Sequence, residues 1–170
     1  MLHKEVARLL NEQINKELYS AYLYLEISNY YQEKNLAGFQ NWYFVQAQEE
    51  RDHAMLFMTY LQNNSESVTL DTIKAPNTSF SDLKDPLNAA MAHEQYVTKL
   101  INNIYDAAFQ EKDYRTMQFL DWFIKEQGEE EKNADDLCKK YDLFGSDAKG
   151  LYLLDAELGA RVYTAPSLVL

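Results

Sequence analysis

The sequence has little of the three residues that most often interrupt or cross-link a chain: one cysteine, three prolines and five glycines among 170 residues. A single thiol, Cys138, excludes an intrachain disulfide framework. It predicts a reducing, cytoplasmic compartment, with the thiol acting as a small apolar filler. The scarcity of glycine and proline favours a few long elements over many turns. With 46% hydrophobic residues, the chain is long enough for one domain with a buried core.

Positive charge is also scarce, since 16 Lys and Arg stand against 27 Asp and Glu, a net charge of −11. Nucleic acids and anionic membranes bind basic patches, so this balance argues against both as partners. No stretch approaches the roughly 18 apolar residues of a membrane span. Residues 1–13, MLHKEVARLLNEQ, are typical of an amphipathic helix and not of a signal peptide. The excess acid suits cations, although acidity alone is more typical of ordinary solubility.

Hydrophobic periodicity predicts four long helices and a short fifth. Their approximate bounds are Lys4 to Lys34, Gly38 to Gln62, Asp85 to Glu111, Asp113 to Tyr141, and Asp147 to Leu158. Gly38 is expected to break the chain between the first two helices. Asp85 is expected to cap the third, with Pro86 at its first helical position. Gly145 and Gly150 are expected to separate the fifth helix from the fourth.

The connections predict how these helices are arranged. The links after the first and third helices are short, which favours two antiparallel hairpins. Residues 63–84 form a long polar link, and about twenty extended residues cover about 65 Å, more than the length of one helix. The sequence therefore predicts an all-α four-helix bundle with one long crossover. Val68 to Ile73 is expected to lie as an extended strand along the outside. Residues 1–160 are expected to form the domain and 161–170 a tail, either packed on a neighbouring subunit or disordered.

Each long helix carries an apolar stripe at alternating steps of three and four residues, and each stripe is interrupted near its middle. The interrupting residues are, in chain order, Glu17, Glu50 with His53, Glu94, and Gln127 with Glu130. The two pairs are spaced i, i+3, which places both members on one helix face. In antiparallel hairpins all the interruptions fall at a similar height, so they should meet inside the bundle.

Four converging carboxylates need positive charge, because burying an unpaired carboxylate costs several kcal/mol. No Lys or Arg occupies the stripes, and two divalent metal ions bridged by one carboxylate would supply the charge. Oxygen-rich ligands with one imidazole favour iron or manganese over a thiolate-type zinc site. A single glutamate on a stripe is more often an edge residue, but four coincident interruptions favour a metal centre. His93 lies about 100° around the helix from Glu94 and is interpreted as a flank residue; His3 is assigned no role.

This ordered set, together with the long crossover and the short fifth helix, resembles the bacterial non-haem ferritins over residues 1–160. The resemblance implies a ferritin-like four-helix bundle with two iron sites that share a bridging Glu50. The first site is Glu17, Glu50 and His53, the second is Glu50, Glu94 and Glu130, and Gln127 is the amide beside them. Tyr24 matches the family tyrosine near the irons, where it could donate a hydrogen bond or an electron. Plain core packing is the other interpretation of Tyr24.

The resemblance also implies a third, more exposed iron site formed by Glu49, Glu126 and Glu129. As solvated surface glutamates these residues would need no explanation. Arg51 and Asp52 are expected on outer faces. Arg51 stands where bacterioferritins place a haem-ligating methionine, which implies no haem. Animal ferritins have acidic residues lining an iron channel at two helix positions that are Met117 and Leu120 here.

The function implied by the resemblance is a ferroxidase and iron store. It would oxidise Fe(II) with dioxygen or hydrogen peroxide and hold ferric mineral in a hollow homo-oligomeric shell, a 24-mer, with the fifth helix at the four-fold axes. One alternative is a di-iron or di-manganese oxidase or peroxidase, which would need a substrate pocket and no shell. Another is a non-catalytic helical scaffold, for which no iron-dependent oxygen uptake is expected.

Overall fold

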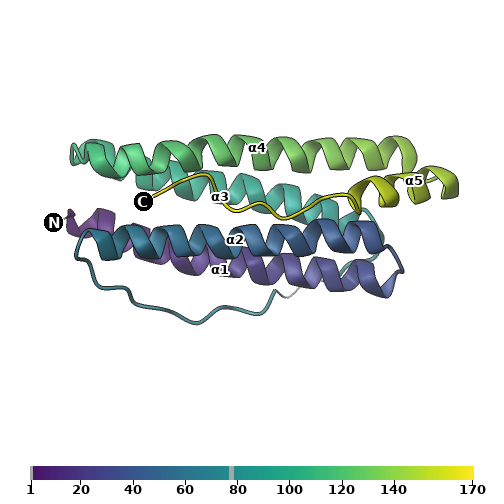
Figure 1. Cartoon of the computed structure of the whole chain (residues 1–170), viewed down its shortest axis with the longest axis horizontal. Coiled ribbons are helices and arrows are strands. Elements are labelled where there is room, and N and C mark those ends of the chain that lie inside the picture. Colours follow the sequence, from purple (N-terminus) through teal and green to yellow (C-terminus); the bar gives the residue numbers. More distant parts are fainter. Residues whose placement is uncertain (1, 77–78) are drawn as a thin grey trace.

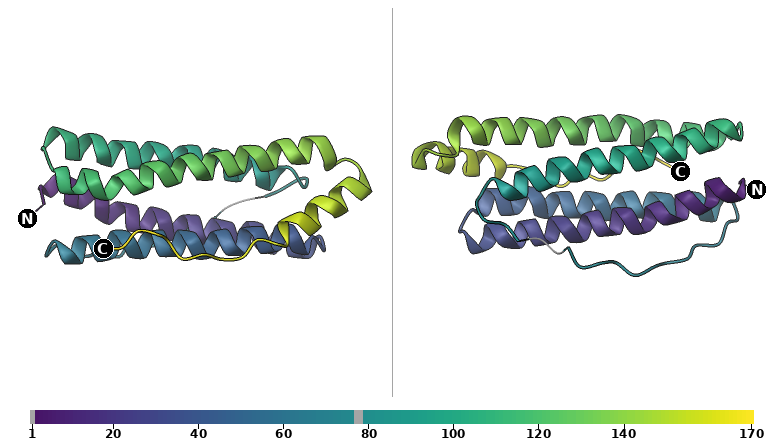
Figure 2. Two further views of the ribbon diagram at one scale, coloured as in Figure 1. Left: turned by 45° about the horizontal axis from the view of Figure 1, so that its top comes forward. Right: turned by 180° about the vertical axis from the view of Figure 1, so that it is seen from behind.

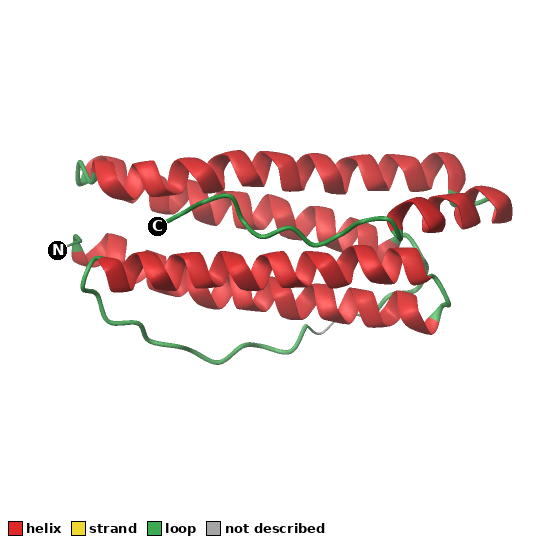
Figure 3. Ribbon diagram, in the orientation of Figure 1, coloured by secondary structure: helices red, strands yellow, loops and turns green. Residues whose placement is uncertain are grey.

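The structure, a computed structural model, describes residues 2–76 and 79–170. It contains α1 (Lys4–Glu33), α2 (Ala37–Asn63), α3 (Asp85–Gln110), α4 (Tyr114–Phe144) and α5 (Ala148–Leu158). Those residues include no strand, and α1 to α4 lie side by side as a bundle with α5 at one end (Figures 1 and 3). The all-α prediction is confirmed, and the predicted bounds agree to within one helical turn. Within this described part, none of the helices combines the length and apolarity that a membrane crossing needs.

The crossover between α2 and α3 runs back along the outside of the bundle beside α1 (Figure 2). Two α1 side chains hold it. Asn11 donates to the backbone oxygen of Thr69 at 2.9 Å and accepts from its N–H at 2.8 Å, and Asn15 donates to the Thr72 oxygen at 3.2 Å. The segment expected to be a strand, Val68 to Ile73, therefore does lie along the outside. It is not a strand, because its backbone bonds with side chains of α1 and pairs with no second strand.

Two apolar clusters fill the bundle, one on each side of its middle. The first contains Leu10, Phe57, Ile104 and Phe123, among others, and the second contains Tyr24, Phe39, Leu87 and Leu137. The polar residues of the four stripes fall between the clusters. Cys138 packs half-buried against the second cluster, as a filler should. Leu120 is completely buried in the first cluster, so it cannot line an intersubunit channel. The register of α4 turns this position into the core, which agrees with its having an apolar residue in place of an acidic channel residue.

Two helix starts differ from the prediction. Asp85 is the first residue of α3 and not its cap; Asp82 accepts from the N–H groups of Lys84 and Asp85, at 2.8 and 3.0 Å. Gly150 lies inside the first turn of α5, where its N–H donates to the carboxylate of Asp147 at 2.6 Å. The N-cap of α5 is the Asp147 side chain, whereas Lys84, the N-cap residue of α3, makes no side-chain cap, and apolar periodicity reveals neither detail.

Gly38 is not the break between α1 and α2, because α2 begins at Ala37 and the left-handed residue in the link is Asn35, with φ 58°. Gly38 instead lets α5 approach α2. A Cβ there would lie 1.6 Å from the backbone oxygen of Asp155. The Asp155 carboxylate also accepts from the N–H groups of Gly38 and Phe39, at 2.9 and 3.0 Å, and so caps α2.

Gly38→Ala is therefore expected to displace α5 and to lower the free energy of unfolding by about 1–3 kcal/mol. In a chain of this length that corresponds to a fall of several degrees in Tm, measurable by scanning calorimetry. Gly128→Ala is the matched control, since Gly128 also lies in a helix but a Cβ there would meet nothing within 4 Å. That variant should be neutral or more stable. Equal losses in both variants would contradict the docking role of Gly38.

The chain after α5 also packs on its own bundle. Residues 159–170 run back beside α2 and α4 toward the end that holds the N-terminus (Figures 1 and 2). Tyr163 donates a hydrogen bond to Asp52 of α2, and Trp122 of α4 donates to the hydroxyl of Ser167 at 3.0 Å. The tail is thus placed across two helices of its own subunit, and its packing on a neighbouring subunit stays a prediction.

Candidate metal centre

The interruptions of the four stripes meet in the middle of the bundle. Ligand atoms of Glu17, Glu50 and His53 all lie within 4.8 Å of one another, and so do those of Glu50, Glu94 and Glu130. Each of the five side chains is buried, with no more than 6% of the residue exposed. One residue each comes from α1, α3 and α4 and two from α2, as predicted. Glu50 belongs to both groups, so the geometry is that of two adjacent sites with a shared carboxylate.

Neighbouring amides orient the carboxylates of α1 and α2. Gln13 donates to one oxygen of Glu17 at 2.9 Å, and Gln46 donates to one oxygen of Glu50 at 2.8 Å. The other oxygen of Glu50 lies 3.3 Å from Nδ1 of His53. The second oxygen of Glu17 is, among the described residues, a buried side-chain atom without a hydrogen-bond partner. A buried oxygen in that condition is suited to a metal ion.

Glu94 is held from two sides. Tyr24, which is fully buried, donates a hydrogen bond to one of its oxygens, and Gln127 donates to the other at 3.1 Å. The Tyr24 ring also stacks on Tyr43, with the centroids 5.7 Å apart. Tyr24 therefore both packs in the core and donates a hydrogen bond at the centre. Gln127 lies beside the two groups, as the sequence predicts.

The carboxyl groups of the centre are too close together and too deeply buried to be ionised all at once. Burial and repulsion from Glu50 raise the pKa of Glu17 and of Glu130 to about 8, and raise the pKa of Glu94 well above its usual range. Burial is the largest single effect on Glu50 and opposes its ionisation, but the hydrogen bonds with His53 and Gln46 and the attraction of His53 together outweigh it and lower the pKa of Glu50. Burial would lower the pKa of His53, yet Glu50 raises it to about 10. Protons thus occupy a donor set that divalent cations could take over.

Three flanking positions can be compared with the sequence. His93 is absent from both ligand groups, as predicted, but it is buried and its Nε2 lies 2.7 Å from the hydroxyl of Ser20. The side chain of Arg51 is 68% exposed, also as predicted. The side chain of Asp52 is 20% exposed and accepts a hydrogen bond from Tyr163 of the tail, which packs on the outside of the four helices. Asp52 therefore faces outward, as predicted.

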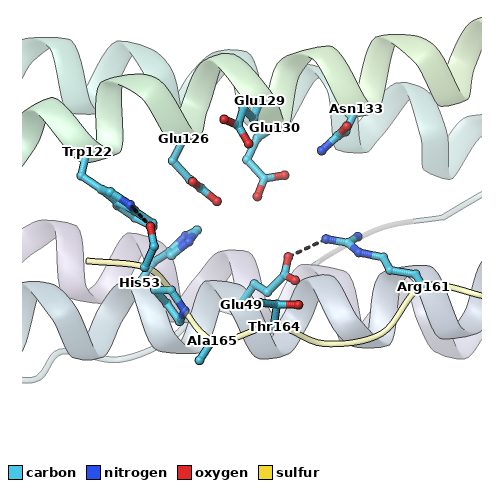
Figure 4. A pocket seen from close by; sticks show the side chains of 12 residues that line it. Glu49, His53, Trp122, Glu126, Glu129, Glu130, Asn133, Arg161, Thr164 and Ala165 are labelled. Atoms are coloured by element: carbon cyan, nitrogen blue, oxygen red, sulfur yellow. Dashed lines mark hydrogen bonds and ion pairs between the residues drawn. The ribbon is translucent and has the colours of Figure 1, made fainter. Parts of the chain in front are cut away.

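The predicted third-site residues line one cavity of about 300 Å³ on the tail side of the bundle (Figure 4). Its helical lining consists of Glu49, His53, Trp122, Glu126, Glu129, Glu130 and Asn133. Burial raises the pKa of Glu49 and of Glu126. Among the described residues these carboxylates do not gather as closely as the two central groups. Glu49 pairs with Arg161, and Glu129 lies 3.6 Å from Lys125. A third metal site stays a prediction.

Two kinds of hydrogen-bonding partner of the acidic side chains were not predicted from the sequence. Gln13 stands four residues before Glu17, and Gln46 four before Glu50; this repeated Gln-x-x-x-Glu spacing was a readable signal, because i, i+4 side chains are neighbours. Arg161 had no comparable signal. It lies in an irregular tail whose path no periodicity predicts.

A four-helix bundle that gathers four glutamates and a histidine from facing helices defines the ferritin-like class of dinuclear carboxylate proteins. The family model for the ferritin-like domain matches residues 7–144, and the chain belongs to the ferritin family. It is 43% identical over 155 residues to a bacterial non-heme ferritin of Campylobacter jejuni, covering 91% of this chain and 93% of that one. It is 38% identical to one of Staphylococcus epidermidis, covering 96% and 98%.

Solved structures agree. The fold matches an engineered closed form of the Archaeoglobus fulgidus ferritin with a TM-score of 0.94 and 39% identity, over 96% of this chain and all of that one. It matches the open-pore ferritin of the same archaeon with a TM-score of 0.93 and 38% identity, over 95% and 100%. The resemblance to bacterial non-haem ferritins is confirmed, and these similarities support an iron-storage ferritin.

Proposed function

We propose that this ferritin oxidises Fe(II) to Fe(III) at the buried centre and stores the product as ferric mineral inside a homo-oligomeric shell, a 24-mer. The observation that carries the proposal is the pair of buried ligand groups sharing Glu50. The residues proposed to serve the reaction are Glu17, Tyr24, Glu50, His53, Glu94, Gln127 and Glu130. The exposed Arg51 accords with a centre that uses no haem. We place the protein in the cytoplasm, without nucleic acid or membrane as a partner.

Fe(II) is the substrate, and the chain supplies its ligands. Hard carboxylate oxygens favour the harder Fe(III) product. Two Fe(II) ions give up one electron each. Dioxygen takes these two electrons and two protons to become hydrogen peroxide, or hydrogen peroxide takes them to become two waters. Binding of the cations displaces protons from Glu17 and Glu130. Tyr24 and Gln127 keep Glu94 in place throughout.

An oxidase acting on an organic substrate is less well supported. Such an enzyme needs a pocket beside the reactive centre. On the Tyr24 side of the centre the structure leaves a space of only about 20 Å³, bordered by Glu94 and Glu130. The larger cavity is lined mainly by glutamates and polar tail residues, which suit a cation better than an apolar substrate.

The proposal is tested by anaerobic Fe(II) titration followed by addition of air. We expect at least two tightly bound Fe(II) per chain, oxygen uptake in proportion to the iron added, and elution as a large shell in size-exclusion chromatography. A protein that oxidises iron but elutes as a monomer or small oligomer, without forming a shell, would favour the oxidase. A shell that oxidises no iron, with either air or hydrogen peroxide, would favour the scaffold. Either result would overturn the proposed function.

A further inference from the structure

The tail is the outer wall of the acidic cavity. Four consecutive tail residues, Thr164 to Ser167, line it opposite the helices, together with Arg161. In Figure 4 the tail runs along the α2 side of the cavity near Glu49, and Glu126, Glu129 and Glu130 lie on the opposite, α4 side.

Arg161 holds the tail to α2 through several contacts. Its guanidinium forms an ion pair with Glu49, and the two side chains are only 15% and 18% exposed. The same group lies 4.3 Å from the ring centroid of Trp42 and donates to the Trp42 backbone oxygen at 3.3 Å. A planar guanidinium held over an indole and against a carboxylate is well ordered, and a half-buried pair is screened by salt less than a surface one.

The charges in the cavity explain why this arginine matters. The lining carries four carboxylates, those of Glu49, Glu126, Glu129 and Glu130, and Arg161 is its one Lys or Arg side chain in the described chain. A metal ion that used Glu49 as a ligand would have to take the carboxylate from the guanidinium. The cation at Glu49 is thus either Arg161 or a metal ion.

We propose that Arg161 is a built-in counter-cation that competes with a metal ion for Glu49 and thereby sets the affinity of the third carboxylate cluster. This inference rests on the proposed function, since iron is the ion concerned. Because coupling is reciprocal, the pairing weakens the third ion and the third ion in turn loosens the tail. The side-chain bonds of Arg161 go to Glu49 and Trp42 and to no residue of the two central groups, on which it acts only through its longer-range attraction for Glu130.

Arg161→Gln tests the inference by removing the charge. We expect calorimetric titration with Zn(II), which has no redox chemistry, to show two tight ions per chain in both proteins. The third ion should bind about tenfold more tightly to the variant, because it no longer has to break one charge-assisted ion pair to reach Glu49. Lys125→Gln is the matched control, because it removes an equal charge beside Glu129 from a side chain that is 79% exposed. Its effect should stay within about twofold.

A second measurement uses the wild-type chain. Hydrogen exchange followed by mass spectrometry should show faster exchange in residues 159–170 when the third Zn(II) binds, with no such change at the first two. Unchanged tail exchange, or a third-ion affinity that Arg161→Gln leaves unchanged or weakens, would overturn the competition. Failure of the proposed function looks different, because the two tight central ions would then be missing from every variant.

Discussion

Replacing Glu50 by glutamine is expected to slow Fe(II) oxidation by roughly 100-fold or more at low iron. Glu50 is the one ligand shared by both groups, so its loss affects two sites at once. Even residues that only support a ligand typically change metal affinity or activity by roughly 10–100-fold. Glutamine keeps the shape of the side chain and can still bond with Gln46, but it has no charge with which to bridge two cations. The initial rate after addition of air to Fe(II)-loaded protein measures the effect.

The control is Glu26→Gln, which makes the same chemical change at an exposed position of α1. This variant should oxidise iron at the wild-type rate. Anaerobic titration of the Glu50→Gln protein should also show fewer than two tight Fe(II) per chain. If that protein instead oxidises iron as fast as Glu26→Gln does, the centre assigned here is not the site of oxidation.

The positions of the central acidic residues could be predicted, because a charged residue on an otherwise apolar helix stripe is easy to recognise. Glu17 and Glu94 occupy positions on apolar stripes, where burying an unpaired charge is unfavourable. Both side chains are buried in the structure. The same reasoning works poorly for Glu49 and Glu126, which lie at the edge of the stripes. Their partial burial depends on a tail packed over them, and helix periodicity carries no information about that tail.

The helices and their arrangement could also be predicted from the sequence, but one helix contact could not. Long amphipathic stripes and one long link suffice for a bundle with a crossover. The docking of α5 could not be predicted, since it depends on a single missing Cβ at Gly38 against the backbone of Asp155. From sequence, Gly38 has the appearance of a helix break. Only the position of a helix more than a hundred residues later in the chain gives it another role.

Glu17→Gln should make the metal-free protein more stable at high pH, even though it removes a ligand. The pKa of Glu17 is 4.5 as a reference and about 8 in the folded chain. The folded state therefore binds more protons than the unfolded state between these values, and stability falls as pH rises from 4.5 through about 8. Glutamine resembles the protonated form at every pH. The two proteins should match near pH 4.5, and the variant should be more stable at pH 9 by on the order of 5 kcal/mol.

Calorimetry of metal-free protein across this pH range measures the difference, with Glu26→Gln as the control that should follow the wild type. His53 changes stability in the same direction. Its pKa is raised in the folded chain, so the stability that the protonated imidazole supplies is lost as pH rises from 6.5 through about 10. Comparing the two variants therefore measures Glu17 together with its electrostatic coupling to His53 and Glu50. Added Zn(II) should reverse the order at high pH, since only the wild type offers the deprotonated carboxylate that a cation needs. A variant no more stable than the wild type at pH 9 would mean that Glu17 ionises freely in the fold. The unpartnered oxygen of Glu17 would then be no sign of a cation site.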